Sequence, residues 1–117
     1  MRRLTEAESK VMNILWANEP VTAKRISDIA KEEVGWSINT TYTIITKLCE
    51  KGFITRNYPK FTCTSTYPKE EVRLNEIDKV VDRFFNGSKE LFFSALLDYD
   101  KLDKKEIEEL RKVIKEK

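Results

Sequence analysis

Residues 53–67 constrain the fold most, because they interrupt a chain that otherwise has helical periodicity. Residues 53–57 and 61–67 are rich in β-branched and aromatic side chains, which favour strands. Tyr58-Pro59-Lys60, between the two runs, has the composition of a bend. The sequence therefore predicts one β-hairpin within a helical chain.

Three helical segments precede this hairpin, and each begins after a residue that can cap a helix. Thr5 and Glu8 have the spacing of a capping box, and Thr22 and Ser37 stand before the next two apolar patterns. Gly52 is expected to end the third helix in a left-handed conformation. The first helix should end near residue 18, and the third should cover residues 38–51.

Pro68 marks a change of character along the chain. After it, a helical pattern runs from Glu71 to Asn86, a very apolar segment follows Ser88, and a last helix starts near Asp103. The predicted fold class is therefore mainly α. Residues 1–68 would form a winged helix-turn-helix of three helices and a hairpin wing, and residues 69–117 a three-helix dimerisation domain.

The third helix carries the pattern that points to a function. Its expected inward stripe consists of Thr41, Ile44, Ile45 and Leu48, and the opposite stripe is polar. Residues 38–49 contain no Asp or Glu, although the chain has 20 acidic residues. Asparagine can contact adenine, threonine can present a hydroxyl or a methyl group, and lysine can neutralise a phosphate. We therefore expect contacts with double-stranded DNA from Asn39, Thr40, Tyr42, Thr43, Thr46 and Lys47, with Arg56 and Lys60 of the wing.

The C-terminal segment is expected to form a homodimer. Three short helices cannot enclose a core alone, and the segment from Leu91 to Leu97 leaves almost no polar face. A second copy of the chain is the simplest cover. The alternative is a monomer in which these helices fold back on the N-terminal domain. The residues predicted to dimerise are Val81, Phe84, Phe85, Leu91, Phe92, Leu96, Ile107, Leu110 and Ile114.

Composition argues against an enzyme. The chain has no histidine, which removes the commonest general base and metal ligand. Cys49 and Cys63 have no partner motif, and three scattered glycines form no phosphate loop. We expect no catalytic residue, no metal and no cofactor. No apolar run is long enough to span a membrane and the N-terminus lacks a secretory core, so we expect a cytoplasmic protein without a membrane partner.

Five segments of this chain together follow a known family pattern: Glu8 to Trp16, Trp36-Ser37, Thr40 to Leu48, Glu50 to Ile54 and Ile107 to Arg111. Through them the chain resembles the penicillinase-repressor family, which includes BlaI-, MecI- and CopY-type repressors. The resemblance covers essentially the whole chain in the same order. It implies a winged-helix domain, a helical dimerisation domain and repression by a homodimer at a dyad-symmetric operator. The third helix supplies the family's major-groove contacts.

The sequence also departs from this family pattern. Family members often carry basic residues where this chain has Asn39 and Tyr42, which implies a different operator and a shallower salt dependence. Penicillinase-type members are inactivated by cleavage of an Asn-Phe bond; the matching bond here is near Ala95-Leu96, and the Asn-Phe pair is absent. CopY-type members use a cysteine-rich motif near the C-terminus, and this chain has no cysteine after Cys63. An unidentified inducer or protease stays open as the trigger.

Two alternatives stay open. The winged helix would serve as a protein-protein adaptor without sequence-specific DNA binding if its third helix exposed large apolar anchors, for which only Tyr42 qualifies. The other alternative keeps the DNA binding and changes the trigger: the apolar helix at residues 91–97 would line a small-molecule pocket in the dimer, although nothing in the sequence identifies a ligand.

Overall fold

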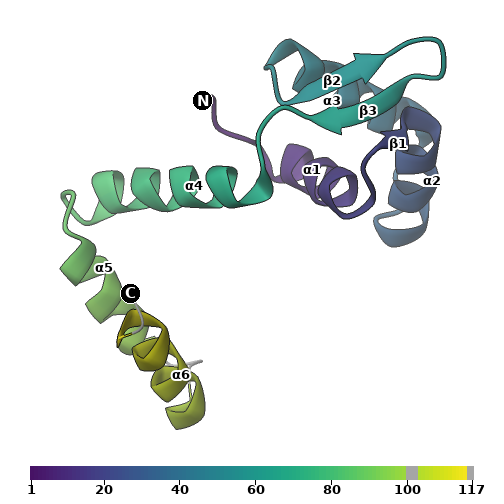
Figure 1. The fold of residues 1–117 in the computed structure, drawn as a ribbon. Coiled ribbons are helices and arrows are strands. Elements are labelled where there is room, and N and C mark those ends of the chain that lie inside the picture. The colour runs from purple at the N-terminus through teal and green to yellow at the C-terminus, as the bar shows by residue number, and fades with distance from the viewer. Residues whose placement is uncertain (100–102, 116–117) are drawn as a thin grey trace. The chain divides into compact units, whose positions relative to one another are not determined.

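The computed structural model describes residues 1–99 and 103–115, which divide into two compact units, Met1–Asn75 and Glu76–Lys117. Within the described residues the order of elements is three helices, a hairpin and three helices, with one short strand added early in the chain (Figure 1). The expected mainly helical, winged helix-turn-helix class is confirmed. The boundary predicted after Pro68 stays a prediction.

The three N-terminal helices begin at the predicted caps. Helix α1 (Glu6–Asn18) has a complete capping box, in which Thr5 and Glu8 each bond the other's backbone N–H. Thr22 accepts from the backbone N–H of Arg25 at the start of α2 (Ala23–Glu33). Ser37 accepts from the backbone N–H of Thr40 at the start of α3 (Ile38–Glu50). These hydrogen bonds satisfy backbone donors that have no partner inside the helix.

A three-stranded antiparallel sheet carries the wing. Strands β2 (Ile54–Asn57) and β3 (Thr62–Ser65) form the predicted hairpin, with Arg56 opposite Cys63. A two-residue strand, β1 (Val21–Thr22), pairs with the other edge of β3, giving the order β1-β3-β2. The sequence did not predict β1, because two residues are too few to show an alternating pattern.

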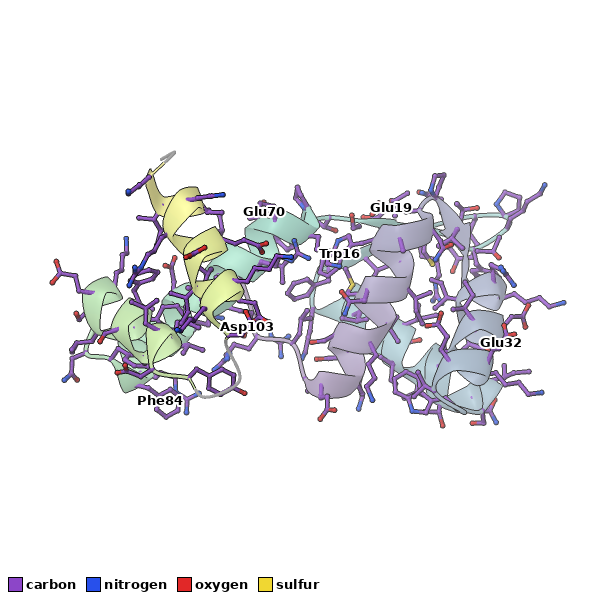
Figure 2. The ribbon with its side chains drawn as sticks, turned by 90° about the horizontal axis from the view of Figure 1, so that it is seen from below. Trp16, Glu19, Glu32, Glu70, Phe84 and Asp103 are labelled. Carbon is purple, nitrogen blue, oxygen red and sulfur yellow. The ribbon has the colours of Figure 1, made fainter. Side chains whose placement is uncertain are left out.

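The core of the first unit lies between the three helices and the sheet. Its largest fully buried side chains include Phe53, Met12 and Leu15. Phe53 meets Tyr67 edge-on at 5.4 Å between ring centroids, and the indole N–H of Trp16 (labelled in Figure 2) donates to the Tyr67 carbonyl at 3.0 Å. This hydrogen bond joins α1 to the end of the wing and so fixes the hairpin on the helices.

The remaining helices are α4 (Lys69–Phe84), α5 (Lys89–Leu97) and α6 (Lys104–Lys115). Helix α4 starts and ends two residues before the expected bounds, because it begins directly after Pro68 and the left-handed Asn86 and Gly87 follow its end. Ser88 caps α5 as predicted. None of the helices in the described residues is long and apolar enough to cross a membrane.

Candidate nucleic-acid interface

Helix α3 is held on the first unit by one buried face. Thr41, Ile45 and Leu48 are fully buried, as the sequence predicted, whereas Ile44 is half-buried at the margin of the stripe. The end of the helix is closed by Gly52, whose φ of +83° is the predicted left-handed conformation. The turn between α2 and α3 contains Gly35 at φ +84°. The two helices therefore have the connectivity of a helix-turn-helix.

The opposite face of α3 forms a shallow groove of about 490 Å³. Five of the six side chains predicted there line it, while Thr40 lies outside it, where its hydroxyl accepts a hydrogen bond from Ser37. Tyr42 is half-buried and packs against the core, so only part of its ring faces the groove. The lining residues are Asn39, Tyr42, Thr43, Thr46, Lys47 and Glu50.

Charge is distributed unevenly along this groove. Lys47 is exposed, and no acidic residue occurs between residues 38 and 49. Glu50 is exposed at the C-terminal end of the groove. A polyanion would therefore meet a neutral to positive surface over most of α3 and a negative charge only at its end.

The wing holds a small cluster of one arginine and two aromatic side chains, which the sequence predicted only in part. Arg56 and Lys60 were predicted, and Lys60 is exposed at the tip. The guanidinium of Arg56 lies over the ring of Phe61, 5.3 Å from its centroid, within range of a cation–π interaction. The ring of Tyr58 meets Phe61 edge-on at 5.0 Å. Phe61 was missed because only the folded hairpin brings it beneath Arg56.

Phe61 also ties the wing to the helix-turn-helix. Its backbone carbonyl accepts a hydrogen bond of 3.0 Å from the N–H of Ala23, the first residue of α2. The wing cluster, defined as Arg56, Tyr58 and Phe61, is thus attached to the same unit that carries α3.

Lys51, at the end of α3, makes an ion pair that the sequence did not reveal. Its ammonium lies 2.7 Å from the carboxylate of Glu8 and also donates to the carbonyl of Arg3 at 3.3 Å. Burial by itself raises the pKa of the Glu8 carboxyl, but the hydrogen bonds from Lys51 and from the Thr5 backbone outweigh it and lower that pKa overall. The pair joins the start of α1 to the end of α3.

The two cysteines are free thiols beside the wing. Burial raises the pKa of the Cys49 thiol, which the positive charge of Arg56 partly offsets. Burial likewise raises the pKa of the Cys63 thiol, and the neighbouring Cys49 raises that pKa further. Raised thiol pKa values oppose nucleophilic chemistry. Within residues 1–99 and 103–115, no group of three acidic, cysteine or histidine side chains could hold a metal ion.

The residues predicted to dimerise all lie in the second unit, which includes the C-terminal part of α4. Phe84 (Figure 2) is 70% exposed and Leu91 56% exposed, whereas Val81 is already covered by its own chain at 3%. Ile114 is exposed, and the other predicted residues, Phe85, Phe92, Leu96, Ile107 and Leu110, are half-buried. The bond between Ala95 and Leu96 lies inside α5.

An apolar groove of about 320 Å³ opens on this unit. Phe85 and Phe92 meet edge-on at 5.3 Å on its wall. Helices α5 and α6, whose residues are all described, contain no buried residue. The groove is lined by Val80, Phe85, Phe92, Ala95, Leu96 and Tyr99.

Comparison with known proteins gives matches along nearly the whole chain. The model of the family described as "Penicillinase repressor" matches residues 4–116. The chain is similar to the methicillin resistance regulatory protein MecI of Staphylococcus aureus (strain N315), with 28% identity over 97% of this chain and 94% of that protein. It is also similar to the penicillinase repressor of Bacillus licheniformis, with 24% identity over 97% of this chain and 91% of that protein.

Proposed function

Because this chain belongs to the penicillinase repressor family, we propose that it represses transcription by binding a dyad-symmetric DNA operator as a homodimer. The observation that carries the proposal is the exposed polar face of α3, which the helix-turn-helix presents without acidic residues from Ile38 to Cys49. The relatives named as repressors support it.

The recognition step follows from the geometry of α3. The second helix of a helix-turn-helix enters the major groove, where its side chains reach base edges. Asn39 would contact an adenine and Lys47 a phosphate, while the wing would place Arg56 and Lys60 against the flanking backbone. Tyr42 contributes less to base contact than the sequence suggested, because half of it packs on the core.

Dimerisation follows from the apolar surface of the second unit. Phe84 and Leu91 are exposed, and the groove lined by Phe92 is open. Exposed apolar patches mark sites of protein–protein contact. A second copy of the same unit would cover both features. A two-fold dimer would present two α3 helices to half-sites about 34–36 Å apart.

The adaptor alternative is less well supported. Protein-binding faces concentrate large aromatic or aliphatic anchors. Within α3, all of whose residues are described, Ile38 is the exposed large apolar side chain, at 55%, and it lies alone at the start of the helix. Apart from the half-buried Tyr42, the groove of α3 is lined by polar and charged side chains, which suit a polar partner better.

We propose that an unidentified inducer or a protease triggers release of the repressor from DNA. The resemblance places the family's cleaved bond near Ala95-Leu96, and these two residues lie inside α5. Proteases bind extended chain, so cleavage at this position would require local unfolding of α5.

The test is binding of the full chain to a genomic duplex that spans its own promoter, measured over a salt series beside a shuffled duplex of equal composition. We expect tight binding to the genomic duplex only, weakened by Thr43→Ala and by Lys47→Ala. Lys47→Ala should also reduce the salt slope by about 0.9. Equal affinity for both duplexes, unaffected by either substitution, would exclude a sequence-specific repressor.

A further inference from the structure

Two threonines one turn apart on α3 differ in what their hydroxyl groups do. The hydroxyl of Thr43 donates to the backbone carbonyl of Asn39, with 2.8 Å between the oxygens. The hydroxyl of Thr46 has no hydrogen-bond partner among the residues that the structure describes. Both side chains are exposed and both line the groove of α3. The two residues therefore offer different chemistry to the same partner.

The hydrogen bond of Thr43 decides which of its groups faces outward. A threonine hydroxyl has a single hydrogen, which here is committed to the carbonyl one turn back in the same helix. The bond turns the oxygen toward the helix backbone and leaves the methyl group as the outward substituent. Thr43 thus presents its methyl group among the polar side chains that line the groove, while its oxygen keeps only the capacity to accept a hydrogen bond.

In the major groove, an apolar surface has one specific counterpart among the bases. Thymine carries a C5-methyl group there, while the other edges present hydrogen-bond donors and acceptors. A methyl group placed against a donor or acceptor would remove its water without replacing it. A methyl group that faces the major groove from this position would therefore favour thymine.

Resting on the proposed operator binding, we propose that Thr43 reads a thymine through its methyl group, whereas Thr46 binds DNA through its hydroxyl. Thr43 is then a specificity-determining residue. The hydroxyl of Thr46 can donate to a phosphate or to a base acceptor without breaking a bond inside the protein.

The experiment separates methyl from hydroxyl at each position. Duplexes are first selected by the wild-type chain from a randomised library, and affinities are then measured for Thr43→Val, Thr43→Ser, Thr46→Val and Thr46→Ser. Valine keeps the methyl and removes the hydroxyl, and serine does the reverse. Each thymine of the selected duplex is also replaced in turn by deoxyuridine, which lacks the C5-methyl group. Thermal unfolding of each variant verifies that the helix is retained.

We expect Thr43→Val to bind like the wild type and Thr43→Ser to bind about fourfold more weakly, which corresponds to about 0.8 kcal/mol for one buried methyl group. At one thymine per half-site, deoxyuridine should weaken the wild type by a similar factor and leave Thr43→Ser unaffected. At position 46 the order should reverse, with valine weak and serine near normal.

Two results would overturn the inference in distinguishable ways. Selective binding that survives Thr43→Ser but not Thr43→Val would show that the Thr43 hydroxyl carries the contact, and the proposed operator binding would stand. Equal responses of Thr46→Val and Thr46→Ser would remove the role given to the Thr46 hydroxyl. Failure of the library to enrich any sequence would reject the proposed function itself.

Discussion

The carboxylate of Glu8 and the ammonium of Lys51 lie 2.7 Å apart and connect the first turn of α1 to the residue that follows α3. The Glu8 side chain is 4% exposed and that of Lys51 is 18% exposed, so solvent screens the pair only weakly. The same carboxylate accepts the backbone N–H of Thr5 at 2.8 Å. One side chain thus caps a helix and anchors the candidate DNA-binding helix.

Removing the charge of Glu8 should therefore destabilise the first unit. We expect Glu8→Gln to lower the free energy of unfolding by about 1–3 kcal/mol, because the amide leaves the Lys51 ammonium without its counterion. The matched control is Glu6→Gln, which removes the exposed pair between Glu6 and Lys10 at 3.9 Å. That change should cost less than about 0.5 kcal/mol in urea unfolding. Equal effects of the two substitutions would show that burial does not strengthen the Glu8 pair.

The same pair predicts a pH dependence of stability. The folded-state pKa of Glu8 is lowered, so its contribution is present above the ordinary glutamate pKa and is lost as the pH falls through the folded value. Urea unfolding of the wild type and Glu8→Gln, measured from neutral to acid pH, should give curves that converge in acid. A difference that stays constant over this range would contradict the assignment.

Ser27 offers a contrasting case, because its buried hydroxyl has no hydrogen-bond partner in the part of the chain that the structure describes. A buried polar group without a partner destabilises a fold. We expect Ser27→Ala to raise the free energy of unfolding by about 1 kcal/mol. The buried Thr41 hydroxyl, which donates to the Ser37 carbonyl at 3.3 Å, gives the control. Thr41→Val should destabilise, and a loss of stability in Ser27→Ala would reject the prediction.

Substitutions in the apolar groove of the second unit should dissociate the proposed homodimer. Phe92→Asp and Leu96→Asp place a charge among half-buried apolar side chains, and multi-angle light scattering should then give the mass of a single chain. Ser94→Asp adds the same charge to α5 at an exposed position and should leave the dimer intact. A dimer that survives both Phe92→Asp and Leu96→Asp would place the interface elsewhere.

The wing cluster predicts a role for Phe61 in positioning Arg56. We expect Arg56→Ala to weaken operator binding and to reduce the salt slope by about 1. Phe61→Leu, which removes the ring beneath the guanidinium, should weaken binding in the same direction, because a mobile Arg56 loses more freedom on binding. Phe61→Tyr keeps the ring and should therefore retain wild-type affinity. Normal binding by Phe61→Leu would show that Arg56 needs no support.

Much of the fold is local and could be predicted from sequence. Thr5, Thr22, Ser37 and Ser88 cap their helices as expected, because capping is satisfied within a few residues of the chain. The buried stripe of α3 followed from helical periodicity, since Thr41, Ile45 and Leu48 share one face. The same periodicity placed Asn39, Thr43, Thr46 and Lys47 on the opposite face, where they line the groove.

What the sequence left undecided depends on contacts between distant segments. Strand β1 exists because Val21 lies opposite Cys63, a partner far along the chain. Helical spacing placed Tyr42 on the outward stripe of α3, yet its side chain packs against the core. The shape of that core could not be predicted from the sequence. Sequence alone determined the caps, the hairpin and most of the buried face of α3, because neighbouring residues determine them. Only the tertiary structure paired Glu8 with Lys51 and set Arg56 on Phe61, because those interactions require the helices and the wing to be packed together.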